Sequence, residues 1–207
     1  MPIPMVLVMW LFQSTCVVCE SSANGVCERC VDSLEPAEVP QLLAVRSATV
    51  LCSYEGVGAE LVTAIKYQNK RQALTPLCDA LAASLPTDFD AIVAVPANPA
   101  RRRERGFDVP ELIAKRLSKR MGIPVMTPLH RADDGSQQGR GKAERQGVEF
   151  RAAERVPERV LLVDDVITTG ATAVACAITL GLAGARSISF VALAATPTPR
   201  GVVPAAV

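Results

Sequence analysis

The stretch RVLLVDDVITTGAT, residues 159–172, places two adjacent carboxylates, Asp164 and Asp165, between an apolar run and a loop of small residues. Backbone N–H groups at a helix N-terminus, with threonine hydroxyls beside them, bind a monophosphate. The carboxylates would repel that phosphate, so they suit the vicinal hydroxyls of a sugar or a hydrated Mg²⁺. A ribose 5-phosphate carries both kinds of group. The predicted phosphate loop consists of Thr168, Thr169, Gly170, Ala171 and Thr172.

The same stretch has a simpler interpretation that needs no ligand. Two aspartates after a strand often form a turn, and Thr169 or Thr172 could cap the helix that follows. The spacing of the whole stretch favours the phosphate interpretation, because Gly170 lets the backbone approach an anion closely. A P-loop NTPase is excluded, since the chain contains no Gly-x-x-x-x-Gly-Lys-Ser/Thr motif.

A dense basic run follows a second apolar segment, DAIVAVP at 90–96. Its arginines can form an anion-binding cluster on the same rim as the aspartates, with a pyrophosphate group or a nucleic-acid backbone as ligand. The alternative is a solvated basic turn that precedes an amphipathic helix. The four arginines are Arg101, Arg102, Arg103 and Arg105.

Four of the seven cysteines lie within 15 residues, in the pattern Cys-x₂-Cys, seven residues, Cys-x₂-Cys. This spacing predicts two knuckles that close one tetrahedral zinc site with four thiolates and no open position, so the zinc would be structural. A pair of disulfides is the alternative and would require export. The predicted ligands are Cys16, Cys19, Cys27 and Cys30.

The remaining sequence alternates strand-like and helix-like segments, which predicts an α/β protein with a mainly parallel sheet flanked by helices. Ligands of such sheets bind beyond the carboxyl ends of the strands, where the aspartates are expected. We expect a zinc module and linker at 1–42, an α/β domain at 43–196 and a flexible tail at 197–207. Strands are expected at 48–54, 90–96, 159–165 and 187–195, and helices at 58–68, 74–85, 109–124 and 172–185.

The 207-residue chain has a formal net charge of +1, which argues against a broadly basic nucleic-acid binder. The apolar stretch at 5–12 is too short to span a bilayer. It could be the core of a signal peptide, but no Lys or Arg precedes it. A cytoplasmic protein is therefore expected, with secretion or lipidation at Cys16 as the alternative.

The segment LLVDDVITTGAT resembles the phosphoribosyl pyrophosphate (PRPP) loop of type I phosphoribosyltransferases. The resemblance implies that Asp164 and Asp165 hold the ribose hydroxyls, that the loop from Thr168 to Thr172 holds the 5-phosphate, and that Mg²⁺ accompanies PRPP. The arginines at 101–105 would then hold the pyrophosphate. Enzymes of the hypoxanthine type carry an aspartate base where this chain has Thr168, so a purine salvage enzyme of that kind is not expected.

Most of the chain, from residue 16 to about 195, is similar to the competence protein F (ComF) family. The cysteine cluster, AIKYQNKR at 64–71 and the RRRERGFD segment carry this similarity. It implies a phosphoribosyltransferase linked to DNA uptake or, alternatively, a non-catalytic PRPP-sensing adaptor that binds single-stranded DNA and a helicase partner. It also implies a flexible flap at 130–150 with Arg131 and Arg145, whose altered form here puts catalysis in question more than binding. Asp108 stands where that family usually has Asn.

Overall fold

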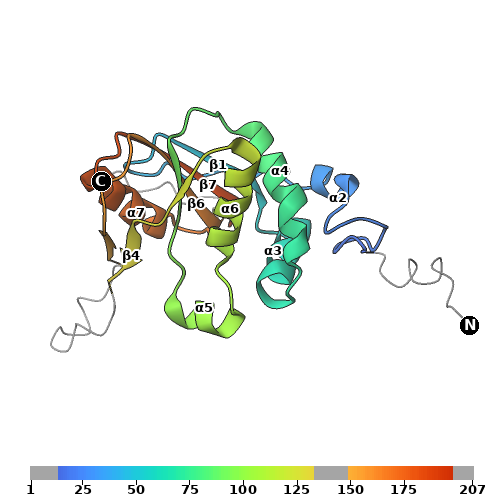
Figure 1. Ribbon diagram of the computed structural model, residues 1–207. Coiled ribbons are helices and arrows are strands. Elements are labelled where there is room, and N and C mark those ends of the chain that lie inside the picture. Colours follow the sequence, from blue (N-terminus) through green and yellow to red (C-terminus); the bar gives the residue numbers. More distant parts are fainter. Residues whose placement is uncertain (1–13, 133–148, 198–207) are drawn as a thin grey trace, which may run out of the picture.

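The computed structural model describes residues 14–132 and 149–197 and contains a five-stranded parallel sheet (Figure 1). The strand order is β1-β7-β6-β2-β3, and every neighbouring pair is parallel, which confirms the predicted mainly parallel sheet. The apolar stretch 5–12, Arg145 and the tail from residue 198 lie outside the described residues. The strands are β1 (Ser47–Ser53), β2 (Ala91–Ala94), β3 (Val125–Met126), β6 (Arg159–Ile167) and β7 (Ser187–Ala195).

Helices cover both faces of the sheet (Figure 1). One face packs against α3 (Gly56–Tyr67), α4 (Leu74–Ser84) and α6 (Val109–Met121), and a 3₁₀ turn, η2 (Arg71–Ala73), leads into α4. The other face packs against α7 (Ala171–Leu182) and an antiparallel pair of short strands, β4 (Leu129–Arg131) and β5 (Phe150–Ala152).

Strand β6 is covered on both faces of the sheet, and this burial explains the uninterrupted apolar run in its sequence. Leu161 and Val163 belong to the core on the α3–α4–α6 side, whereas Val160 and Leu162 belong to the core on the α7 side. Successive side chains of a strand point to opposite faces, so a strand covered on both sides needs apolar residues at every position. Burial of this central strand fixes the position of the residues that follow it.

Strand β6 continues through the aspartates to Ile167, two residues beyond the predicted end. Asp164 pairs in register with Ala192 of β7, so both carboxylates are held by regular ladder geometry. Gly170 precedes α7 in a left-handed conformation with φ of 78° and has no side chain to cap the helix. The one threonine contact to the start of α7 among the described residues is long: Thr169 Oγ1 accepts a hydrogen bond from Ala171 N at 3.4 Å. The alternative of a threonine cap is therefore present only as this weak contact from Thr169.

A short helix not predicted from the sequence, α5 (Pro99–Arg105), carries the basic run. The Asn98 side chain accepts a hydrogen bond from Ala100 N at 2.9 Å, Pro99 occupies the first turn, and Gly106 ends the helix with φ of 75°. Capping by Asn, proline at the start and glycine at the end all favour a helix. All three signals are present in the sequence, but the charge of the segment favoured a basic turn over a helix.

The cysteine segment packs directly on the α/β core through α2 (Glu28–Asp32), which contacts α4. Cys16, Val26 and Cys30 are buried in the same cluster as residues of α3, α4 and α6. The linker also packs on the core: Leu42 is 6% exposed and its side chain closely approaches Gly170. The segment 14–42 is therefore attached along its length rather than tethered at one point.

Candidate functional site

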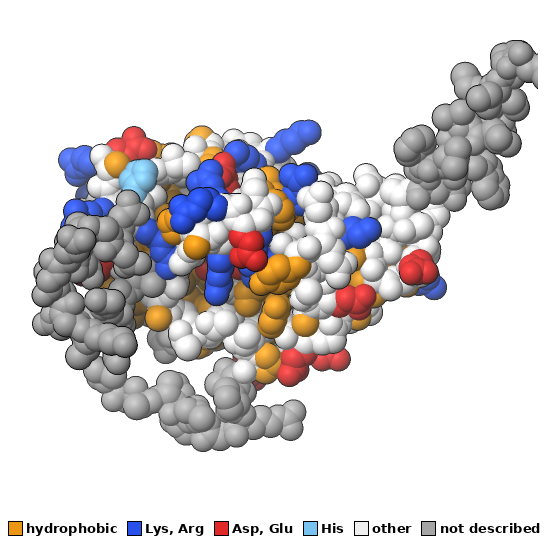
Figure 2. All heavy atoms as spheres, turned by 90° about the horizontal axis from the view of Figure 1, so that it is seen from below, with side chains coloured by type: hydrophobic (Ala, Val, Ile, Leu, Met, Phe, Trp, Pro, Cys, Tyr) orange, Lys and Arg blue, Asp and Glu red, His pale blue; other side chains and the backbone are white. Residues whose placement is uncertain are grey.

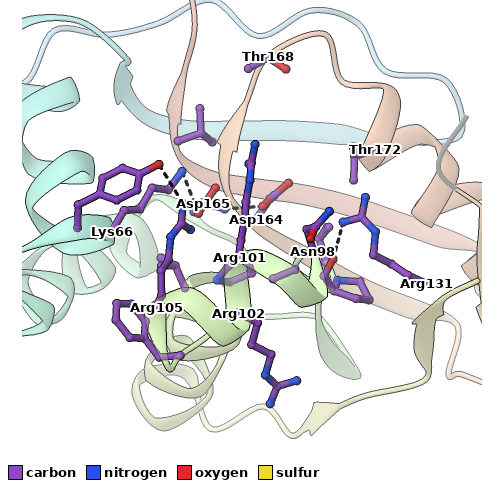
Figure 3. Close-up of a pocket in the computed structure, with 18 of the residues that line it drawn as sticks. Lys66, Asn98, Arg101, Arg102, Arg105, Arg131, Asp164, Asp165, Thr168 and Thr172 are labelled. Atoms are coloured by element: carbon purple, nitrogen blue, oxygen red, sulfur yellow. Dashed lines mark hydrogen bonds and ion pairs between the residues drawn. The ribbon is translucent and has the colours of Figure 1, made fainter. Parts of the chain in front are cut away.

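A cavity of about 460 Å³ opens at the carboxyl ends of β2 and β6 (Figure 3). It joins residues from α3, the loop after β2, α5, β4, β6 and the start of α7. Most of the predicted site residues meet here, although Arg101 and Thr172 are 71 positions apart in the sequence. Those that line the cavity are Asp164, Asp165, Thr168, Thr172, Arg101, Arg102, Arg105 and Arg131. Those that do not line it are Arg103, Thr169, Gly170 and Ala171.

The loop between β6 and α7 places a helix N-terminus beside this cavity. Thr168 and Thr169 are exposed, and Thr169 Oγ1 accepts a weak hydrogen bond from Ala171 N at 3.4 Å. A side chain at position 170 would collide with Leu42, and the positive φ there also favours glycine. The loop thus presents backbone and hydroxyl donors to the solvent at the positive end of α7, where an anion is favoured.

Asp165 forms an ion pair with Lys66, the penultimate residue of α3. The Nζ–Oδ2 distance is 3.0 Å, and the side chains are only 12% and 14% exposed. A partly buried carboxylate without a counterion would be costly, so Lys66 stabilises Asp165 in this position. In the sequence Lys66 lies in the AIKYQNKR segment, but its partner lies about 100 residues away, so the role of Lys66 could not be predicted.

Within residues 14–132 and 149–197, no Lys or Arg forms an ion pair with Asp164. Its Oδ1 accepts a hydrogen bond from Asp165 N at 2.8 Å. Burial, together with the charge of the neighbouring Asp165, raises the pKa of Asp164 to about 8. The two adjacent carboxyl groups therefore differ: Asp165 has a cation beside it, whereas Asp164 retains a proton near neutral pH until a partner favours its ionised form.

The arginines of α5 point in different directions (Figure 3). The Arg101 side chain extends toward the two aspartates, whereas Arg102 points away from them and pairs with Glu111 at 3.6 Å. Seen from the α5 side, Lys and Arg side chains gather on this face of the molecule (Figure 2). Arg101 is therefore the arginine of this run best placed to contact an anion held near the aspartates.

Asp108 anchors the backbone around the cavity. Its Oδ1 accepts a hydrogen bond from Glu111 N and its Oδ2 accepts one from Ala97 N, both at 3.2 Å. It caps α6 and at the same time holds the loop that leads to Asn98 and α5. Desolvation raises the pKa of this buried carboxyl group. Asp108 stands where the resemblance to ComF proteins leads us to expect Asn. Either side chain can cap a helix, but Asn has a single acceptor oxygen and could not accept these two hydrogen bonds on separate oxygens.

Two more arginines form the sides of the cavity. Arg105 Nη2 donates a hydrogen bond to Tyr67 Oη at 3.0 Å, and its guanidinium lies 4.8 Å from the centre of the Tyr67 ring. Arg131 lies on β4, donates from Nη1 to Pro96 O at 3.3 Å and stacks over Phe150. The first arginine of the predicted flap is thus held by strand pairing at the base of that segment.

Several residues of the cavity were not predicted as site residues: Lys66, Tyr67, Asn98, Phe107 and Thr196. They come from helix ends and loops whose proximity depends on the complete fold. The signals in the sequence were the similarities of AIKYQNKR and RRRERGFD to ComF segments, which contain Lys66, Tyr67 and Phe107 but do not say what these residues do.

The four cysteines of the N-terminal segment converge as predicted. The sulfurs of Cys16, Cys19, Cys27 and Cys30 all lie within 4.8 Å of one another. Ligands of a tetrahedral zinc ion at the usual Zn–S distance lie about 3.8 Å apart, so the cluster fits a structural zinc ion. Hydrogen bonds from Ser21 lower the pKa of Cys19 to about 6, which favours the thiolate that a metal requires.

The described residues include no helix long and apolar enough to cross a membrane.

Comparisons with known proteins support this description. No protein-family model matches the chain. Over 105 residues it is 29% identical to the competence protein ComFC of Streptococcus pneumoniae (strain ATCC BAA-255 / R6). The match covers 49% of this chain and 46% of ComFC, so it spans less than half of that relative's length.

Two solved structures are also similar in part. A purine phosphoribosyltransferase from Pyrococcus horikoshii Ot3 gives a TM-score of 0.44 at 25% identity, over 63% of this chain and 76% of that chain. A hypothetical protein from Neisseria gonorrhoeae with bound ppGpp gives 0.37 at 17% identity, over 66% and 76%. The match to ComFC, the parallel sheet and the acidic pair on β6 together support a ComF-type fold of the type I phosphoribosyltransferase kind.

Proposed function

We propose that the cavity binds PRPP. The observation that carries this proposal is the meeting of three kinds of group around one space: the acidic pair, a hydroxyl-bearing loop at a helix N-terminus, and arginines from α5. In this assignment Asp164 and Asp165 accept hydrogen bonds from the ribose hydroxyls. The loop from Thr168 to Thr172 holds the 5-phosphate, and Arg101 and Arg105 neutralise the pyrophosphate, with Arg102 and Arg103 adding to the local positive potential.

The carboxylates also suit a Mg²⁺ ion bound together with PRPP. Magnesium prefers oxygen ligands, keeps several waters and is often held by one or two carboxylates plus phosphates of the substrate. Lys66 already neutralises Asp165, so Asp164 is the carboxylate with more capacity for a hydrated cation. Bound there, Mg²⁺ would supply positive charge that offsets the charge of the pyrophosphate.

If the protein is an enzyme, it transfers the phosphoribosyl group with release of pyrophosphate. Departure of pyrophosphate develops negative charge on the leaving group, and fixed positive groups nearby stabilise it. Arg101 and Arg105 supply such groups, while the aspartates and the loop hold the ribose in position. We propose no general base among the described residues of the cavity, so positioning and charge would carry the reaction.

The alternative is a non-catalytic PRPP-sensing adaptor, in which the same site binds PRPP without consuming it. Arg102 and Arg103 favour a further contact at α5, since both are exposed, Arg102 points away from the aspartates (Figure 3) and Arg103 does not line the cavity. The name of the relative ComFC refers to competence. On that basis we extend the proposal to a cytoplasmic role in DNA uptake, with single-stranded DNA and a helicase-like protein as the partners.

Calorimetric titration of PRPP into zinc-loaded protein, with and without Mg²⁺, tests the binding proposal. A pyrophosphate assay on the same sample then separates an enzyme, which releases pyrophosphate with some acceptor, from an adaptor, which does not. The double variant Asp164→Asn and Asp165→Asn is expected to lose PRPP binding. Asp79→Asn, which changes an exposed carboxylate paired with Arg120, is the matched control and should bind normally. Normal binding by the double variant would refute the assignment.

A further inference from the structure

A groove of about 400 Å³ lies beside the second half of α7, on the face of the sheet opposite α3 and α4 (Figure 1). Ile178, Gly181 and Leu182 of α7 line it together with Ala44, and Arg186 is its only lining residue with a polar side chain. No residue that lines the proposed PRPP site lines this groove. The groove therefore belongs to a different part of the surface.

Exposed large apolar side chains concentrate at this groove. In the described parts of the chain four such side chains are exposed, and two of them, Ile178 at 44% and Leu182 at 87%, line the groove. A third, Leu43, is 72% exposed and directly precedes Ala44 in the chain. Soluble monomers rarely gather such residues in one place, and a patch of this kind usually marks a contact surface.

The helix that carries the groove has no charged residue. Every position from Val166 to Ala185 is uncharged, so α7 lacks the charged stripe that a solvent-facing helix normally shows. By contrast α6, which covers the other face of the sheet, exposes Lys115 and Lys119. A helix that is apolar on its outer side as well is normally covered by another surface.

The shape of the patch is suited to a second copy of the same chain. Leu182 protrudes beside a hollow at Gly181, where an added Cβ atom would meet no other atom within 4 Å. Two identical subunits related by a two-fold axis contact each other through the same patch, so the protruding group and the hollow must lie on one surface. Both lie on α7 here.

The charges at the edge of the groove are also self-complementary. Arg186 pairs with Glu158 at 3.3 Å, and both side chains remain mostly exposed, at 79% and 63%. A strongly acidic or strongly basic partner would be favoured by an edge of one sign, whereas this edge carries one charge of each sign. A two-fold axis can bring Arg186 of one copy toward Glu158 of the other, which favours association of like with like.

We propose that α7 forms the core of a two-fold homodimer interface, in which Leu182 of each copy packs into the hollow at Gly181 of the other. The loop from Thr168 to Thr172 lies at the opposite end of α7 and stays open to a ligand. The interface therefore does not depend on PRPP binding, and either proposal can fail while the other stands.

Analytical ultracentrifugation of the full zinc-loaded chain, from about 1 to 100 µM, should show a monomer–dimer equilibrium. Leu182→Glu places a charge on the protruding side chain and should weaken dimerisation at least about tenfold. The matched control is Ala83→Glu, which adds the same charge at an exposed position of α4, on the other side of the sheet, and should dimerise normally.

Gly181→Gln separates an effect on the interface from an effect on folding. Its side chain has room in the single chain, and Gln favours a helix more than Gly does, so the variant monomer should unfold no more easily than the wild-type monomer. It should nevertheless weaken dimerisation at least about tenfold, because it fills the hollow.

Three results would overturn the proposal. The first is a wild-type chain that stays monomeric at 100 µM in the range given above. The second is a monomer that dimerises only after residues 198–207 are removed, since the chain's own tail would then be the occupant of the groove. The third is a dimer that both Leu182→Glu and Gly181→Gln leave unchanged, since the interface would then lie elsewhere.

Discussion

The two adjacent aspartates have different electrostatic environments, and the difference can be measured. Asp165 is paired with Lys66, whereas burial holds the pKa of Asp164 well above its ordinary value, at about 8. An ionised carboxylate accepts hydrogen bonds from ribose hydroxyls better than a protonated one does. If Asp164 holds the ribose as we propose, ligand binding and deprotonation of Asp164 are coupled, and raising the pH should favour both.

The affinity for ribose 5-phosphate should accordingly increase by about tenfold between pH 7 and pH 9. The phosphate, with a second pKa near 6, is already ionised across this range and adds little. Calorimetry at pH 7, 8 and 9 measures the trend. Asp164→Asn should bind more weakly and show a flat pH profile. A wild-type affinity that is constant or falls with pH would contradict the coupling.

The Lys66–Asp165 pair should contribute to stability because both side chains are largely buried. Lys66→Met leaves the Asp165 carboxylate without its cation and should lower the free energy of unfolding by about 1–3 kcal/mol. Combining it with Asp165→Asn should cost less than the sum of the two single changes.

Urea unfolding of the wild type, the single variants and the double variant measures this coupling. The control is Lys115→Met, since Lys115 pairs with Glu111 at 2.6 Å but is 61% exposed. Breaking that exposed pair should cost about 0.5 kcal/mol or less. Similar losses at Lys66 and Lys115 would mean that burial does not strengthen the pair.

At the scale of elements, helix α5 positions two arginines of the site, and local capping signals determine where it begins and ends. It has only seven residues and no buried ones, so it depends on its caps rather than on packing. The Asn98 cap and the Asp108 contact to Ala97 fix its start, and Gly106 fixes its end. The direction of Arg101 and Arg105 therefore depends on a few backbone hydrogen bonds and one left-handed glycine.

Gly106→Ala should loosen the end of α5 and weaken PRPP binding by about fivefold, because an L-residue in the left-handed conformation costs about 1 kcal/mol. An added methyl group meets no other atom within 4 Å, so the effect is conformational. Calorimetry measures it. Gly122→Ala is the matched control: Gly122 ends α6 with φ of 74° and is equally open. It should lower the melting temperature without changing PRPP affinity. Equal changes in affinity would argue against a specific role of α5.

At the scale of the whole molecule, the zinc cluster should stabilise more than its own segment. Cys16 and Cys30 belong to the same buried cluster as Leu74 and Leu77 of α4. Loss of the metal should expose part of that cluster, so chelation should lower the melting temperature by about 5 °C or more.

Metal analysis and calorimetric melting test this prediction. The wild type should contain one zinc ion per chain, and Cys19→Ser should lose it. Cys176→Ala, which changes a cysteine on the buried face of α7, should keep its zinc although it is destabilised. A melting temperature unaffected by chelation would show that the cluster folds independently of metal.

The bounds of several strands and helices could be predicted from the sequence, because hydrophobic periodicity and capping residues are local features. The strand at 187–195 has the predicted bounds, and the helix after Asp108 begins where Pro110 favours it. The rest depends on contacts between distant segments. The strand order and the pairing of Lys66 with Asp165 arise only when α3 packs on β1 and β7 and its end reaches the carboxyl end of β6. No spacing in the sequence encodes that distance.

The close contact between Leu42 and Gly170 has a consequence for how the protein can be divided. The predicted domain boundary after residue 42 cuts the chain at the side chain that packs against Gly170 in the proposed phosphate loop. A fragment that begins at residue 43 would therefore leave Gly170 uncovered and its loop free to adopt other conformations. Experiments on an isolated catalytic-type domain should start upstream of the linker, since a fragment trimmed at the apparent boundary would lose ligand affinity for a reason unrelated to the ligand contacts themselves.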